Sequence, residues 1–162
     1  MIEENKYDNI IVEKKWEVPY RISVGDTYGR FFTELRDNAK LLGTRCDEHN
    51  KVYFPLRTMC EKNLNSIKDN WVEIEPEGTL EAFTIVTENY VFQNMPKPPF
   101  VICLVRLGKA DTSVPLILKG IDLSDPREAA KRLKVGDRVK VVFKEKRTGC
   151  IEDIHVELKA ES

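Results

Sequence analysis

The order of apolar and polar residues divides the chain into four parts, of which the first is an N-terminal arm. Residues 1–21 mix charges with isolated large apolar side chains and end in Val-Pro-Tyr, a sequence that favours extended chain over helix. This segment is either an ordinary disordered tail or a segment that lies on a partner protein with Trp16 as its anchor. The pattern leaves both alternatives open.

The second part, residues 22–43, has the apolar period of one amphipathic helix. Its apolar positions at helical spacing are Phe31 or Phe32, Leu35, Ala39 and Leu42. Ser23 or Asp26 can cap the start of this helix, and Gly43 can close its end. Two adjacent phenylalanines cannot both lie fully on one face, so we expect one of the pair to point away from the stripe.

From residue 71 the pattern changes to short β-rich runs separated by segments that contain Pro or Gly. Five runs carry it: TLEAFTIVTE, FVICLVRL, VPLILKGI, RVKVVFK and EDIHVEL. Between the third and fourth runs, Asp125 can cap a short helix, Pro126 can take its first position and Gly136 can end it. This order of strands and helix is the plan of an OB-fold barrel, which we assign to residues 68–162.

The third part, residues 44–67, lies between helix and barrel and has the spacing of a zinc ribbon. Two knuckles, Cys46-x-x-His49 and Cys60-x-x-Asn63, flank a hairpin. Zinc prefers four donors at the corners of a tetrahedron, and this spacing turns the two side chains of each knuckle toward one point. We therefore predict a mainly β fold with an N-terminal helix, a rubredoxin-like zinc ribbon and a five-stranded OB-fold barrel.

The fourth coordination position of the metal site has the weakest candidate ligand. Two thiolates and an imidazole are good zinc ligands, whereas the amide of Asn63 is a neutral, weak donor. A bound metal would take its fourth ligand from the Asn63 oxygen, from water, from an acid such as Asp47 or Glu48, or from a partner chain. The alternative is a decayed ribbon held by the packing of Tyr53, Phe54 and Pro55 alone. We favour one structural zinc ion per chain.

Composition limits the function. The 162 residues are 41% hydrophobic, which suits one domain or two small ones. The 26 Lys and Arg nearly balance the 27 Asp and Glu, and the resulting net charge of -1 argues against a protein dedicated to a phosphate backbone. No run approaches the roughly 20 apolar residues that cross a bilayer, and the N-terminus lacks a signal-peptide core. We expect a cytoplasmic protein that binds neither membranes nor nucleic acid.

The chain has little material for a catalytic site of its own. Cys103 lies between apolar neighbours on a predicted strand, and Cys150 has no matched base beside it. One of the two histidines, His49, is a predicted metal ligand, and the other, His155, has no obvious partner. We therefore expect a chain without catalytic residues that can belong to an enzyme complex.

Apolar groups in the arm, the helix and one loop suit contact with a partner protein or an acyl chain. The loop NMPKPPF, residues 94–100, is stiffened by three prolines, so that docking it costs little entropy. Its simpler interpretation is a long hairpin connection. The candidate contact residues are Trp16, Phe31, Phe32, Met95, Pro98 and Phe100.

The order of helix, ribbon, connector and barrel, with the phrases YFPLRTMC, EGTLEAFTIV and PPFVICLVRL, resembles the zinc-ribbon and OB-fold family of acyl-CoA-associated proteins. The resemblance covers about residues 22–158. Members of that family pair with thiolases, with hydroxymethylglutaryl-CoA synthase and with steroid side-chain aldolases of the thiolase superfamily. Cys46 and Cys60 match the two C-x-x-C knuckles of the family, whereas His49 and Asn63 depart from them.

The resemblance implies a division of labour with a thiolase-type partner. The partner would supply the catalytic cysteine for CoA-dependent cleavage or condensation of a β-keto acyl thioester. This chain would stabilise the complex and help to cover or shape the acyl-CoA site. The alternative function is a single-stranded nucleic-acid-binding module, since ribbons and OB-folds both serve that role. The near-zero net charge disfavours it.

Overall fold

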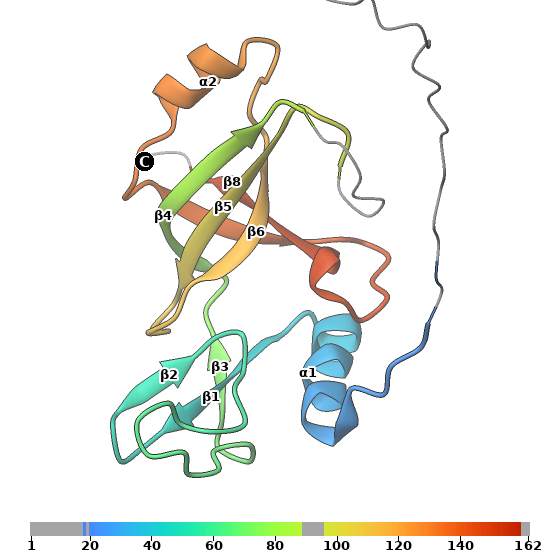
Figure 1. Ribbon diagram of the computed structural model, residues 1–162, viewed down its shortest axis with the longest axis vertical. Coiled ribbons are helices and arrows are strands. Elements are labelled where there is room, and N and C mark those ends of the chain that lie inside the picture. Colours follow the sequence, from blue (N-terminus) through green and yellow to red (C-terminus); the bar gives the residue numbers. More distant parts are fainter. Residues whose placement is uncertain (1–17, 19, 89–95, 160–162) are drawn as a thin grey trace, which may run out of the picture.

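A helix, a three-stranded sheet and a five-stranded barrel follow one another along the chain (Figure 1). The computed structural model describes residues 18, 20–88 and 96–159. Its helical elements are α1 (Gly25–Asn38), α2 (Pro126–Arg132) and the 3-10 turn η1 (Ile151–Asp153). The strands are β1 (Leu41–Cys46), β2 (Lys51–Tyr53), β3 (Trp71–Ile74), β4 (Glu77–Val86), β5 (Phe100–Leu107), β6 (Val114–Lys119), β7 (Arg138–Phe143) and β8 (Ile154–Leu158). The mainly β fold predicted from the sequence is confirmed.

The barrel closes in the order β4-β5-β6-β8-β7, with β4 paired to both β5 and β7. Gly78 lies at this junction, opposite Leu107 on one side and Val139 on the other. A Cβ at this position would collide with the backbone of Arg106. Glycine therefore lets three strands meet where the barrel closes.

The short helix between the third and fourth barrel strands is α2, as the sequence predicted. The Asp125 carboxylate accepts hydrogen bonds from the backbone N–H groups of Arg127 and Glu128, and Pro126 starts the helix. Figure 1 shows α2 at the end of the barrel that lies away from the ribbon.

Alternating residues of the barrel strands form a closed apolar interior. The buried members are Leu80, Val101, Cys103, Val105, Leu107, Val114, Leu116, Leu118, Val139, Val141, Ile154 and Val156. Cys103 is one of them: burial raises the pKa of its thiol to about 12, and its Sγ donates to the Leu116 carbonyl at 3.3 Å. A thiol in this state packs as a small apolar side chain.

Helix α1 is shorter than its apolar pattern predicted. It ends at Asn38, because Ala39 takes a left-handed conformation with φ 51°. Leu41 and Leu42 lie instead in β1, where they pair with β3. The prediction that Gly43 closes the helix was wrong, and neither of the proposed side-chain caps bonds its first turn, since its N-cap is Val24. Strand pairing overrides the helical period here.

One face of α1 packs on the ribbon, and its C-terminal half meets a loop of the barrel. Phe31 and Leu35 are buried, and the Phe31 ring lies 6.1 Å from that of Phe54. Arg147, in the loop before η1, donates from Nε to the Arg36 carbonyl at 2.7 Å. The helix is therefore held from both sides (Figure 1).

The ribbon sheet has the order β2-β1-β3, and the loop between β5 and β6 docks along the outer edge of β2. Asp111 accepts from the Val52 N–H through Oδ2 at 2.9 Å, and its own N–H donates to the Val52 carbonyl at 2.8 Å. Thr112 binds the backbone of Phe54 in the same way through its hydroxyl. These four hydrogen bonds join ribbon and barrel.

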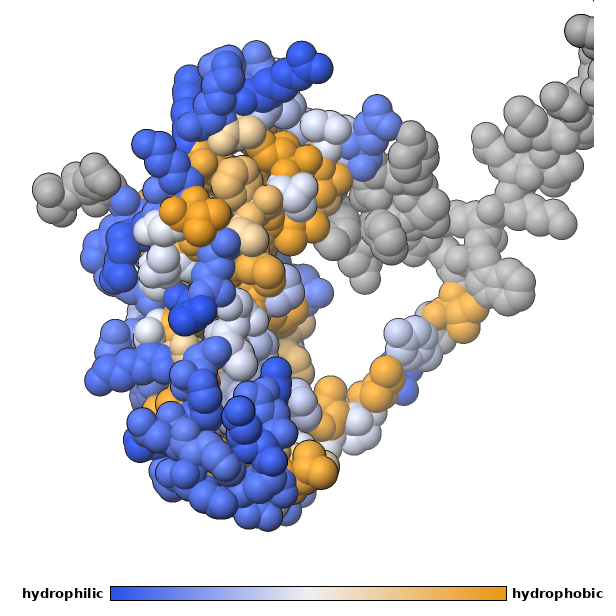
Figure 2. All heavy atoms as spheres, turned by 60° about the vertical axis from the view of Figure 1, so that its left-hand side comes forward, coloured by the Kyte–Doolittle hydropathy of each residue, from blue (hydrophilic) through white to orange (hydrophobic). Residues whose placement is uncertain are grey.

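In the structure the N-terminal arm continues to the start of α1, and its described residues expose every second side chain as an apolar group. Val18, Tyr20, Ile22 and Val24 have relative exposures of 62%, 77%, 71% and 49%. Figure 2 shows this segment standing away from the rest of the molecule, with hydrophobic side chains along it. Within the described ranges, no helix has the length and apolarity required to span a bilayer.

Candidate metal centre

Three predicted metal ligands lie together at the end of the ribbon. Cys46 ends β1, His49 lies in the turn after it and Cys60 lies in the second knuckle. The Nδ1 atom of His49 is 3.5 Å from the Sγ atoms of both Cys46 and Cys60. All three donor atoms lie within 4.8 Å of one another, and both cysteines are buried.

These distances fit a zinc ion. With a Zn–S bond of about 2.3 Å and a Zn–N bond of about 2.0–2.1 Å, the S···N edge of a tetrahedron is about 3.5 Å. The two S···N distances in the ribbon have this value. Two thiolates and one imidazole also form a donor set that binds zinc in preference to hard cations. The residues therefore fit three corners of a zinc site.

Two backbone turns set this geometry. In the first knuckle, Asn50 has a left-handed φ of 49° and its N–H donates to the Asp47 carbonyl at 3.3 Å. In the second, Leu64 has a φ of 60° and its N–H donates to the Cys60 carbonyl at 2.9 Å. The Cys60 N–H in turn donates to the Asn65 carbonyl at 2.9 Å, which closes the second turn.

The two cysteines of this centre belong to a small apolar cluster that is distinct from the main core. Cys46, Tyr53, Cys60 and Ile67 are buried together. The Tyr53 hydroxyl lies 3.6 Å from the Cys60 Sγ, and the Arg57 guanidinium covers the Tyr53 ring at 5.0 Å. Tyr53 therefore keeps solvent away from one side of the thiolate.

The pKa values of the two thiols are shifted in opposite directions. Burial raises the pKa of Cys60, but the backbone N–H groups of Lys62 and Asn63, with hydrogen bonds from Cys46 and Tyr53, outweigh burial and lower it to about 6. The pKa of Cys46 is raised, because its thiol donates to the Cys60 sulfur and because it is buried. These hydrogen bonds therefore favour the thiolate of Cys60, and metal binding would displace the proton of Cys46.

The side chain of Asn63, the predicted fourth ligand, is engaged by its neighbours. Its Oδ1 accepts from the Asn65 N–H at 3.0 Å, and its Nδ2 donates to the Glu48 carboxylate. Asn65 Nδ2 donates to the same Glu48 oxygen, Oε2, at 3.3 Å. The sequence named Glu48, with Asp47, as an acid that could supply the fourth ligand, but it did not predict that two amides hold the Glu48 carboxylate.

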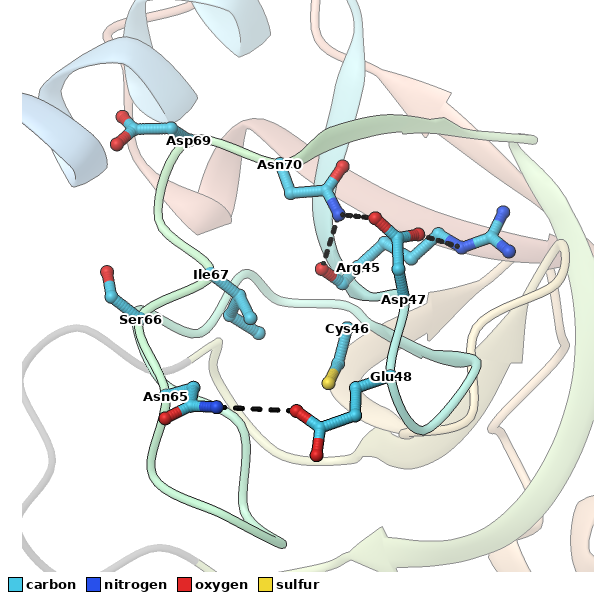
Figure 3. Close-up of a pocket in the computed structure, with 9 residues that line it drawn as sticks. All are labelled: Arg45, Cys46, Asp47, Glu48, Asn65, Ser66, Ile67, Asp69 and Asn70. Atoms are coloured by element: carbon cyan, nitrogen blue, oxygen red, sulfur yellow. Dashed lines mark hydrogen bonds and ion pairs between the residues drawn. The ribbon is translucent and has the colours of Figure 1, made fainter.

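A pocket of about 440 Å³ opens beside the centre, with Cys46 and Glu48 on its wall. Figure 3 shows the Cys46 sulfur and the Glu48 carboxylate directed into it, with Asn65 facing Glu48 from the second knuckle. Asp47 turns the other way, where it binds Asn70 Nδ2 at 2.7 Å and Arg45 Nε at 3.0 Å. The pocket therefore borders the metal centre through Cys46, while His49 and Cys60 are not among its lining residues.

Comparison with known proteins concerns the barrel first. The family described as "ChsH2, C-terminal OB-fold domain" matches residues 71–144. The barrel thus resembles the OB-fold of ChsH2. This match includes all of α2 and every barrel strand except β8.

Two solved structures extend the likeness of fold beyond the barrel. One is a protein of unknown function from the DUF35 family of Sulfolobus solfataricus, with a TM-score of 0.58 and 23% identity over 83% of this chain and 87% of that chain. The other is described as the Ltp2–ChsH2(DUF35) aldolase, with a TM-score of 0.58 and 18% identity over 85% of this chain and 97% of that chain. The arrangement of ribbon and ChsH2-like barrel therefore occurs in known proteins.

The predicted contact residues fall into three groups. Phe31 and Phe100 are buried, with exposures of 2% and 6%, and contribute to the core of this chain. Phe32 and Pro98 are half-buried and present part of their side chains at the surface. Trp16 and Met95 lie outside the described residues.

Proposed function

We propose that this chain is a non-catalytic subunit of a thiolase-type enzyme complex that acts on an acyl-CoA thioester. The match of residues 71–144 to the ChsH2 OB-fold domain carries the proposal. ChsH2 is named together with Ltp2 in the aldolase whose fold this chain shares. A protein of this fold that is named together with a second protein in an aldolase is therefore the precedent.

In the proposed complex the partner carries the catalytic cysteine and cleaves a β-keto acyl-CoA with a second CoA. This chain stabilises the complex and helps to cover the acyl-CoA site. The acyl group of the proposed substrate is aromatic. This part of the proposal rests on the overall resemblance of the sequence to the small subunit of the benzoylsuccinyl-CoA thiolase of anaerobic toluene breakdown.

The exposed arm supports an obligate partner. Its apolar side chains are largely uncovered by the described residues, since each of them is at least 49% exposed: Val18, Tyr20, Ile22 and Val24. An extended segment with one apolar face can lie in a groove of another subunit or along the edge of its sheet. The half-buried Phe32, which follows the arm on α1, continues the proposed contact surface.

The metal centre has a structural role in this proposal. Zinc at Cys46, His49 and Cys60 would hold the two knuckles and, through β1 and β2, the surface on which Phe31 of α1 packs. A bound ion would cross-link the two knuckles and so keep in place the ribbon surface on which the helix packs.

Co-expression with a candidate thiolase subunit, followed by size-exclusion chromatography, tests the proposal. We expect co-elution, and CoA-dependent cleavage of the β-keto acyl-CoA that is faster with this chain than without it. Separate elution, with thiolase activity unchanged by this chain, would overturn the proposal.

Oligonucleotide binding separates the proposal from the alternative of a nucleic-acid module. A labelled single strand is titrated with micromolar protein at low salt, and its fluorescence anisotropy is expected to stay constant. Salt-dependent binding at this concentration would instead support the nucleic-acid function.

A further inference from the structure

We propose that the carboxylate of Glu48 is the fourth ligand of the metal centre, and that Asn63 is a positioning residue that holds Glu48 in place. The inference concerns the ribbon alone and is independent of the proposed enzyme partner. Four observations on the two knuckles carry it.

The first observation is the state of the Asn63 side chain. Its oxygen accepts the N–H of Asn65, two residues further on, which closes the local turn. Its nitrogen donates to Glu48. To ligate a metal, the Asn63 oxygen would have to share or give up this turn hydrogen bond. It would also offer the metal only a neutral amide donor.

The second observation is how Glu48 is held. Its Oε2 accepts from two amide groups, Asn63 Nδ2 and Asn65 Nδ2, both on the opposite knuckle. The other oxygen, Oε1, accepts no hydrogen bond from the part of the chain that the structure describes. Carboxylates that ligate a metal through one oxygen commonly have the other fixed by hydrogen bonds of this kind.

The third observation is position. Glu48 immediately precedes His49, and its carboxylate shares the wall of one pocket with Cys46. Figure 3 shows the carboxylate on the side toward which the Cys46 sulfur points. The Glu48 carboxylate lies outside the group of three donor atoms that are within 4.8 Å of one another. Because the side chain is exposed, a rotation about its bonds would bring Oε1 toward these donors while Oε2 stays with its amide partners.

The fourth observation removes the competing acid. The Asp47 carboxylate is directed away from Glu48 and is occupied by Asn70 Nδ2 at 2.7 Å and by Arg45 Nε at 3.0 Å. Of the two acids in the first knuckle, Glu48 is therefore the one free to ligate. Zinc accepts carboxylate oxygens at about 2.0–2.2 Å, so a site of two thiolates, one imidazole and one carboxylate satisfies its coordination.

Titration of the metal-free chain with Co²⁺, followed by its visible absorption, and competition with a chelator for Zn²⁺ test the assignment. We expect Glu48→Gln to weaken metal binding by about 100-fold or more, and Asn63→Ala by about 10-fold as the loss of a supporting contact. Asp47→Asn is the matched control in the same knuckle, with an affinity within about twofold of the parent chain.

The result that would overturn the inference is the reverse order: Asn63→Ala losing more affinity than Glu48→Gln, or Glu48→Gln binding like the parent. Glu48→Gln keeps an oxygen that can accept from both asparagines, so its fold is expected to persist. Infrared difference spectra of the parent chain with and without Zn²⁺ give a second readout. A carboxylate band must shift on binding, and a spectrum without such a shift would also overturn the inference.

Discussion

The hydroxyl of Thr112 accepts a hydrogen bond from the Phe54 N–H at 2.9 Å and donates one to the Phe54 carbonyl at 2.8 Å. One side chain of the barrel thus completes the backbone hydrogen bonding of the ribbon at the residue that follows β2. Phe54 is fully buried, so these backbone groups have little access to water. The position of the ribbon on the barrel depends on this contact.

Replacing Thr112 by Val removes both hydrogen bonds at nearly constant volume. We expect the free energy of unfolding to fall by about 1–3 kcal/mol, because two buried backbone groups lose their partner. Urea denaturation measures the change. Thr84→Val, at an exposed position of β4, is the control and should be close to neutral. Equal effects of the two substitutions would contradict the importance of the hydrogen bonds between Thr112 and Phe54.

Removing a cysteine of the metal centre should remove the metal. Elemental analysis of the purified chain is expected to find close to one zinc per chain, lost in Cys46→Ser and in Cys60→Ser. Cys150→Ser serves as the control, since Cys150 binds Thr148 at 3.2 Å away from the centre. A parent chain that is folded and free of metal would show that packing alone holds the ribbon.

The pH dependence of stability should carry a contribution from Asp153. This buried carboxylate accepts from the N–H groups of Thr148, Gly149 and Cys150 at 2.7, 2.7 and 3.1 Å. Burial raises its pKa, but these three donors outweigh burial and hold the pKa below its usual value. The ionised group therefore stabilises the fold at neutral pH, and the contribution disappears as the pH falls through the folded-state pKa.

Asp153→Asn tests this contribution, because it keeps an oxygen acceptor and removes the charge. We expect the variant to be less stable than the parent at pH 7 by about 1–3 kcal/mol. The difference should shrink as the pH falls below about 4. Urea unfolding at pH 7, 5, 4 and 3 measures it, with the exposed Glu145→Gln as control. A difference that is constant with pH would exclude the charge as its cause.

Substitutions in the arm should weaken the proposed complex without affecting the fold. Tyr20→Ser and Ile22→Ser each remove an exposed apolar side chain that a partner would bury, at about 1.5–3 kcal/mol per side chain. The dissociation constant should rise about tenfold or more for each, while the unfolding midpoint stays constant. Arg21→Ser, on the opposite face of the extended segment, is the control. Unchanged affinity of the double variant would exclude the arm from the interface.

The barrel could be predicted from the sequence because its signals are local. Each strand run was bounded by Pro or Gly, and Asp125 and Pro126 marked the start of α2. The end of α1 could not be predicted in this way. Leu41 and Leu42 fit the helical period equally well, and only their pairing with β3, about 30 residues later in the chain, places them in a strand.

The metal ligands likewise divide into three that have a local sequence signal and a fourth that does not. The spacing of Cys46, His49 and Cys60 is a local signal, and the structure brings these three donors together. The fourth corner depends on which side chains meet across the two knuckles, namely Glu48 with Asn63 and Asn65. Spacing says nothing about such contacts. The same holds for Asp111, whose partner Val52 is 59 residues away in sequence.

The docking of Asp111 and Thr112 on β2 also affects how the protein can associate. An exposed edge strand offers unpaired N–H and C=O groups to any extended chain and invites uncontrolled sheet growth. Here the outward backbone groups of Val52 and Phe54 are already taken by the barrel. A second polypeptide cannot add a strand at this edge, so the ribbon is protected there from self-association through its sheet.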